Sequence, residues 1–141
     1  MRSKFIYKMD NYNTANIHRY IDGLPHLLFL IYTENGQTIA AYSQGAFKAK
    51  TLSNRDGLLI NLNNRKIFVN SRKAIVYDEV EVIFGNFDLR LRAGDSKLFS
   101  NFGSNNSFYQ CQGESVNALI GEGKNREVKL KNYEIFQAIF E

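Results

Sequence analysis

The sequence predicts a mainly β protein of the α+β type, a two-sheet antiparallel β-sandwich with one or two peripheral helices. Seven or more short apolar or alternating segments follow one another, with turn residues about every eight to twelve residues, as in sandwiches. These segments do not alternate regularly with helical patterns, which disfavours a parallel sheet. The chain has 141 residues, 44% of them apolar and 23% charged, so we expect one globular domain over residues 1–141.

Residues 10–22 predict the one clear helix. Asn13 or Thr14 can cap its start, and Gly23 can end it. Its apolar side chains recur at spacings of three and four and share one face: Ile17, Tyr20 and Ile21.

Two hairpins follow. Residues 27–33 and 37–43 flank an Asn35-Gly36 pair, a strong hairpin signal because both residue types tolerate positive φ. Residues 27–33 are apolar on both faces, so we expect an interior strand that is covered on each side. The second hairpin joins residues 58–62 to residues 67–69 through Asn63-Asn64.

Further strands are expected at residues 74–77, 80–84, 88–92 and 128–136. In the strand over residues 88–92, Leu89 and Leu91 should face inward, and Asp88, Arg90 and Arg92 should face outward. The polar stretch over residues 93–110 predicts a long surface loop. Its apolar residues should pin it to the core: Leu98, Phe99, Phe102, Phe108 and Tyr109.

Charge and apolar runs limit the function classes. The formal net charge is +4, and the only basic cluster is Arg65, Lys66, Arg72 and Lys73, which is more typical of a solvated face than of a nucleic-acid site. The longest apolar run covers residues 27–32, too short to cross a bilayer. The single cysteine, Cys111, fits a reducing compartment. We therefore expect a cytoplasmic protein with no nucleic-acid partner and no direct membrane insertion.

Residue types for catalysis and metal binding are few. The only histidines are His18 and His26, and we expect a helix-surface His18 and a buried, inert Cys111 rather than a Cys–His pair. The sequence predicts no metal site, no cofactor and no catalytic residues. Asp88 and Glu134 could form an acid–base pair if the fold joined them, but carboxylates that accept backbone hydrogen bonds at loop junctions are the commoner arrangement.

Several blocks of residues stand in a fixed order along the chain. The first half carries Phe5-Ile6-Tyr7-Lys8, the apolar strand over residues 27–33 and Ala40-Ala41-Tyr42. The second half carries the more specific positions, which we take as structural or interaction residues: Gly85, Asp88, Leu89, Ser104, Asn106, Ser107, Tyr109, Glu134 and Phe136. In this order the blocks resemble a TLDc domain over about residues 3–140. The chain has no tryptophan, which the family commonly carries after the second strand, so the resemblance implies a divergent or minimal member.

The resemblance implies a function as well as a fold. TLDc proteins are associated with resistance to oxidative stress, and several bind the vacuolar proton-pumping ATPase (V-ATPase) and regulate or disassemble it. We therefore expect a non-enzymatic protein-interaction domain with the V-ATPase as its first candidate partner, presenting residues 100–109 or 139–141. One alternative is a fixed structural subunit of another large cytosolic assembly, such as a cytoskeletal or membrane-associated complex. The other is an antioxidant enzyme that uses Cys111 or the Asp88/Glu134 pair.

Overall fold

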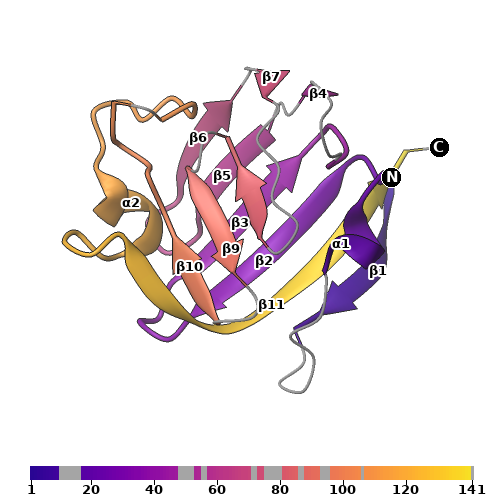
Figure 1. Cartoon of the computed structure of the whole chain (residues 1–141), viewed down its shortest axis with the longest axis horizontal. Coiled ribbons are helices and arrows are strands. Elements are labelled where there is room, and N and C mark those ends of the chain that lie inside the picture. Colours follow the sequence, from indigo (N-terminus) through magenta and orange to yellow (C-terminus); the bar gives the residue numbers. More distant parts are fainter. Residues whose placement is uncertain are drawn as a thin grey trace.

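The computed structural model describes residues 1–9, 17–47, 53–54, 57–70, 73–74, 81–85, 88–92, 96–105 and 107–140. Its elements are, in chain order, β1 (Arg2–Lys8), α1 (His18–Ile21), β2 (Leu27–Thr33), β3 (Thr38–Ser43), β4 (Ser53–Asn54), β5 (Gly57–Asn61), β6 (Lys66–Asn70), β7 (Lys73–Ala74), β8 (Val82–Phe84), β9 (Leu89–Arg92), β10 (Lys97–Phe99), α2 (Val116–Ile120) and β11 (Glu127–Ile139). The prediction of a mainly β, antiparallel fold with one or two helices is confirmed, and the structure has two short ones (Figure 1).

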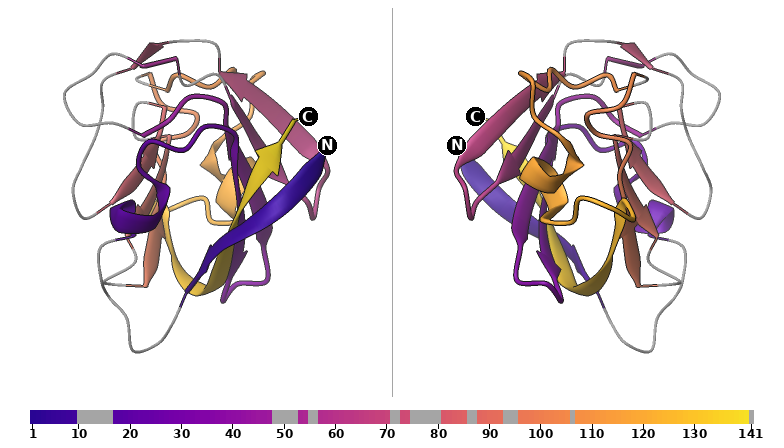
Figure 2. Two further views of the ribbon diagram at one scale, coloured as in Figure 1. Left: turned by 90° about the vertical axis from the view of Figure 1, so that its right-hand side faces the viewer. Right: turned by 90° about the vertical axis from the view of Figure 1, so that its left-hand side faces the viewer.

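One long strand, β11, joins the two layers of the fold. The main sheet runs β6-β5-β3-β2-β11-β10-β9-β8, with β1 also paired to β11, while β4 and β7 form a separate ribbon. The first residues of β11 pair with β10, and the later ones pair with β2 on one side and β1 on the other. The sheet therefore folds over itself, so that β8, β9 and β10 lie across β2, β3 and β5 (Figures 1 and 2).

The core between the layers is rich in aromatic rings. Phe29 of β2, Phe84 of β8 and Phe47 meet edge to face, with ring centroids 5.1 to 6.2 Å apart. All three are almost completely buried. Such edge-to-face contacts add about 0.5–1.5 kcal/mol per pair to the free energy gained by burial. This triad therefore stabilises the packing of the two layers against each other.

Local turn chemistry explains why the two hairpins form where the sequence predicts them. Gly36 has a φ of +83°, and the Asn35 side chain donates to the Ile120 carbonyl at 3.0 Å, which fixes the β2–β3 turn against α2. The β5–β6 turn is closed by amides: Asn61 Oδ1 accepts from the backbone N–H of Asn63 at 2.8 Å, and Asn64 donates to the Ala118 carbonyl at 2.8 Å.

Several predicted boundaries were wrong. The helix observed is α1, only four residues long, and residues 10–16, including the cap candidates Asn13 and Thr14, lie outside the described residues. The predicted loop over residues 93–110 contains strand β10, because its residues pair with both β9 and β11. Strand β1 was not predicted. Of the strands expected at 74–77 and 80–84, the structure describes β7 and β8, while residues 75–80 lie outside its description.

The expectation that the 27–33 strand is covered on both sides was also wrong. β2 is an interior strand, and Leu27, Phe29 and Ile31 are fully buried on its core side. Leu28 and Leu30, on its other side, are only half-buried. Neither of the two described helices has the length and apolar composition needed to cross a membrane.

Candidate interaction surface

The side of the main sheet that faces away from the core, which we call the outer face, carries two rows of mostly apolar side chains. Strand register places its residues opposite one another across five strands. The first row is Phe136, Leu28, Tyr42, Leu58 and Val69, and the second is Glu134, Leu30, Ala40, Ile60 and Ile67. Because neighbouring strands lie about 4.8 Å apart, each row spans about 19 Å.

Among the residues of these two rows, exposure is greatest on β6. Ile67 is 50% exposed, Val69 is 40% exposed, and Leu62, in the turn that follows β5, is 47% exposed. Leu58 and Ile60 beside them are half-buried. Contiguous apolar exposure of this kind marks interaction surfaces in soluble proteins, whereas scattered single residues do not.

The exposed side of the outer face coincides with an edge of the sheet. β6 is the last strand on the path that ends β3-β5-β6. Edge strands usually carry charges that prevent pairing with other chains, yet Ile67 and Val69 are apolar here. The Val69 carbonyl accepts from the Gln110 N–H at 2.9 Å, so the 107–112 segment covers part of this edge. Lys66 at the start of β6 is paired with Glu114 at 2.5 Å.

Tyr42 gives the centre of the outer face a polar group. It hydrogen-bonds His26 Nδ1 through its hydroxyl at 2.8 Å, and burial raises the pKa of the Tyr42 phenol above its usual value. The phenol is thus held neutral, and the row remains uncharged between Leu28 and Leu58.

Several of the positions predicted from the sequence blocks form a buried cluster around Asp88. Its carboxylate accepts from the backbone N–H groups of Phe108 at 2.9 Å and Tyr109 at 3.0 Å, and from the Ser107 hydroxyl. Asp88 is fully buried, so the prediction that it faces outward was wrong. Asp88 precedes β9, so the inward–outward alternation of the strand's side chains does not apply to it. Its carboxylate accepts hydrogen bonds from donors that are buried away from water.

Ser100, Gly85 and Tyr109 complete the Asp88 cluster. The Ser100 hydroxyl donates to the Asp88 carbonyl at 2.6 Å and accepts from the Phe102 N–H at 3.0 Å. Gly85 lies against the Asp88 carboxylate, with no room for a side chain. Ser100 could not be singled out from the sequence, because a serine two residues before a buried aromatic carries no distinctive signal.

The remaining sequence-predicted positions lie elsewhere. Leu89 is fully buried in the core, and Ser104 lies in the turn before Ser107, which donates to its carbonyl at 3.2 Å. Asn106 lies outside the described residues. Phe136 lies on the outer face, with its ring edge to face with Phe5 at 5.9 Å.

Glu134 does not join Asp88 in a common site. It lies in the second row of the outer face, half-buried, where the Tyr32 hydroxyl approaches it at 3.5 Å. Asp88 contacts the 107–109 segment, so the two carboxylates have different surroundings.

His18 is buried and not on the helix surface as expected, and Cys111 is half-buried and not fully buried. His18 is buried, with Nε2 donating to the Glu81 carbonyl at 2.6 Å and Nδ1 contacting Asp22 at 2.6 Å. Cys111 is half-buried, and its sulfur lies 3.3 Å from the Ser107 hydroxyl and 3.2 Å from the Tyr109 carbonyl. The hydrogen bond to Glu81 joins α1 to the residue that precedes β8.

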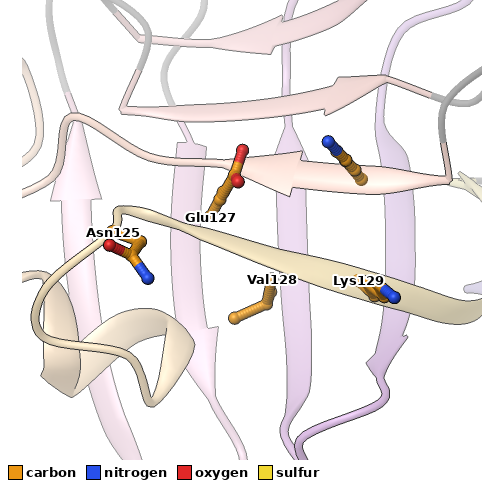
Figure 3. A pocket seen from close by; sticks show the side chains of 5 residues that line it. Asn125, Glu127, Val128 and Lys129 are labelled. Carbon is orange, nitrogen blue, oxygen red and sulfur yellow. The ribbon is translucent and has the colours of Figure 1, made fainter.

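A shallow hollow of about 250 Å³ lies where β10 meets the start of β11. Figure 3 shows Asn125, Glu127 and Lys129 along that start; Val128 and Lys97 complete its lining. Across the described part of the chain, no three His, Cys, Asp or Glu side chains gather in a way that could hold a metal ion.

The chain matches no protein-family model and no curated protein sequence.

Proposed function

We propose that this chain is a non-enzymatic protein-interaction domain that docks on a larger assembly through the outer face. The observation that carries this proposal is the pair of apolar rows across β11, β2, β3, β5 and β6, with Ile67 and Val69 exposed on the edge strand. The partner it fits is a protein that presents an apolar surface of its own, because apolar burial drives most protein association.

The outer face suits docking better than the loop that the sequence pointed to. In the 100–109 segment, Phe102 is fully buried and Tyr109 nearly so, so these rings fill the core. On the outer face, Tyr42 and Phe136 are half-buried aromatic residues, the type that dominates interface energetics.

The V-ATPase is the first partner to test, and the support for it is the resemblance of the sequence blocks to TLDc domains. That resemblance also supports a link to oxidative-stress resistance. A fixed structural subunit of another cytosolic assembly would use the same outer face, so the two alternatives differ in the partner and not in the surface.

The Asp88 cluster supports a structural rather than a catalytic role for that carboxylate. Both of its oxygens accept hydrogen bonds, from two backbone N–H groups and from Ser107. A general base needs a lone pair that faces a substrate, and Glu134 stands apart from this cluster. An antioxidant enzyme would therefore have to use Cys111, whose sulfur contacts Ser107 and the Tyr109 carbonyl.

The test compares three versions of the chain on the purified cytosolic sector of the V-ATPase. Ile67→Thr/Val69→Thr makes the exposed side of the outer face polar while it retains β-branched residues in β6. Tyr20→Thr is the matched control, because Tyr20 is 48% exposed on α1, away from the outer face. We expect binding by the wild type and the control, and about tenfold or greater weakening in the double variant.

A failure to bind that sector rejects the V-ATPase and leads to a second measurement. Proteins from a cell extract that the wild type and Tyr20→Thr retain, and the double variant does not, would identify another assembly. If the three versions retain the same proteins, the outer face has no docking role.

A further inference from the structure

A second surface, on the opposite layer, carries positive charges in strand register. Arg92 of β9 lies opposite Lys97 of β10, and Lys97 lies opposite Lys129 of β11. Leu91, Leu98 and Val128, the neighbours in sequence, form the adjoining row on the core side. The three cations thus share the solvent side of the layer, where directly opposite side chains stand about 4.5–5.5 Å apart.

Arg92 and the two lysines of this row differ in their contacts. Glu81, next to the start of β8, accepts from Arg92 Nε at 2.7 Å and is shared with Arg90 Nη2 at 3.0 Å. Both guanidinium groups also lie over the Phe99 ring, 4.9 and 5.3 Å from its centre. Within the described residues, neither Lys97 nor Lys129 has an acidic side chain within ion-pair distance.

Such a row opposes folding, since like charges directly opposite on neighbouring strands are destabilising. Stability of the sheet does not account for it. An anion that bridges the row would relieve the repulsion, and the hollow lined by Lys97, Glu127 and Lys129 provides room beside it (Figure 3). The lysine ammonium groups bind phosphate as point charges.

We propose that Arg92, Lys97 and Lys129 form a binding site for a compact oligophosphate, a ligand with two or more phosphate groups. The row spans two strand spacings, about 10 Å, which is long enough for two or three phosphates and too short for an extended nucleic-acid backbone. Phe99 does not offer a stacking platform for a base, because the two arginines cover it.

Glu127 limits the site on one side. It follows Asn125 in the lining of the hollow and lies opposite Phe99, in the row next to Lys129. Its carboxylate repels an anion at that end, so the ligand is held over Lys97 and Lys129. Removal of this negative charge should therefore strengthen binding, an effect opposite to that of removing a lysine.

Isothermal titration with inorganic tripolyphosphate tests the site on the full chain at low and physiological salt. Lys97→Gln/Lys129→Gln should weaken binding about tenfold or more. Lys4→Gln/Lys8→Gln removes the same charge from exposed positions on β1 and should leave the affinity unchanged. Glu127→Gln should tighten binding severalfold. Thermal melting without ligand checks folding, and the first variant should melt no lower than the wild type because it removes repulsion.

The source of the phosphates is resolved by a second arm. Phosphatidylcholine vesicles with a bisphosphorylated phosphoinositide, compared with phosphatidylcholine alone, report a lipid headgroup; binding only to free tripolyphosphate indicates a soluble ligand. Loss in the Lys97/Lys129 variant supports the proposal in either case. Equal affinity in both lysine double variants, no binding of either probe, or tighter binding of a short single-stranded oligonucleotide through the same lysines would overturn it.

Discussion

A methyl group on Gly85 would overlap the carboxylate of Asp88. Gly85 has a φ of +67°, and a Cβ built there collides with Asp88 Oδ1 and comes within 3.0 Å of the Tyr109 ring. The glycine is therefore required both by its backbone conformation and by the close approach of a buried carboxylate.

Gly85→Ala should lower the free energy of unfolding by about 2–4 kcal/mol, because left-handed strain is added to displacement of the Asp88 hydrogen bonds. Gly36→Ala is the control, since Gly36 has a φ of +83° but open space around its Cα. That variant should lose only the strain, about 1–2 kcal/mol. Urea unfolding measures both, and equal losses would contradict the collision.

Asp88 and Glu134 should differ sharply in their contributions to stability. Asp88→Asn replaces an acceptor of three hydrogen bonds with an amide that presents a donor to at least one N–H, and should cost about 2–4 kcal/mol. Glu134→Gln should change stability by less than about 0.5 kcal/mol, because its one contact is long and partly exposed. Similar losses in urea unfolding would count against this assignment.

His18 should contribute strongly to stability through one buried and one partly buried contact. His18→Asn cannot reach both the Glu81 carbonyl and Asp22, so we expect a loss of about 2–3 kcal/mol in thermal or urea unfolding. His26→Asn is the comparison, because His26 is half-buried with a φ of +59°, a conformation that asparagine tolerates. A larger loss in His26→Asn than in His18→Asn would contradict the structure.

Stability should fall at alkaline pH because of Tyr133. Burial, followed by the proximity of Tyr7, raises the pKa of the Tyr133 phenol well above its usual value near 10. Above pH 10 the unfolded chain loses this proton while the folded chain keeps it, so the unfolded state binds fewer protons and stability decreases by up to about 1.4 kcal/mol per pH unit. The contribution is fully present below pH 10.

Tyr133→Phe isolates that effect. At pH 8 the variant should be about 1 kcal/mol less stable, because it loses the hydrogen bond to Tyr7. Between pH 10 and 11 the difference should shrink or change sign, since only the wild type suffers the proton-linked loss. A difference that stays constant from pH 8 to 11 in urea unfolding would show that the Tyr133 pKa is not raised.

The sequence predicted those parts of the fold that local chemistry decides. The β2–β3 and β5–β6 hairpins follow from asparagine and glycine turns. β1 and β10 could not be predicted in the same way, because they are short or polar and become strands through pairing with β11. His18 is turned inward by packing against residues more than sixty positions away, which no local pattern encodes.

The outer face could not be predicted from the sequence for the same reason, because it depends on pairing between distant strands. Residues 27–33 are apolar on both faces. This pattern does not show which part of the chain, if any, covers each face. Leu30 and Ile60 become neighbours of Ala40 only through strand register, so the outer face appears as a surface only once the topology is known. The Asp88 cluster was predicted as a set of sequence blocks, but not the inward direction of its carboxylate.

Backbone amide hydrogen exchange on the chain alone and in complex tests the docking surface most directly. With the assembly that the wild type retains, we expect slower exchange over β5 and β6, at residues 57–70, and unchanged exchange in β9 and β10. The Ile67→Thr/Val69→Thr variant should show no such slowing at the same concentration. Protection confined to residues 107–111, or to the β9–β10 layer, would contradict docking through the outer face.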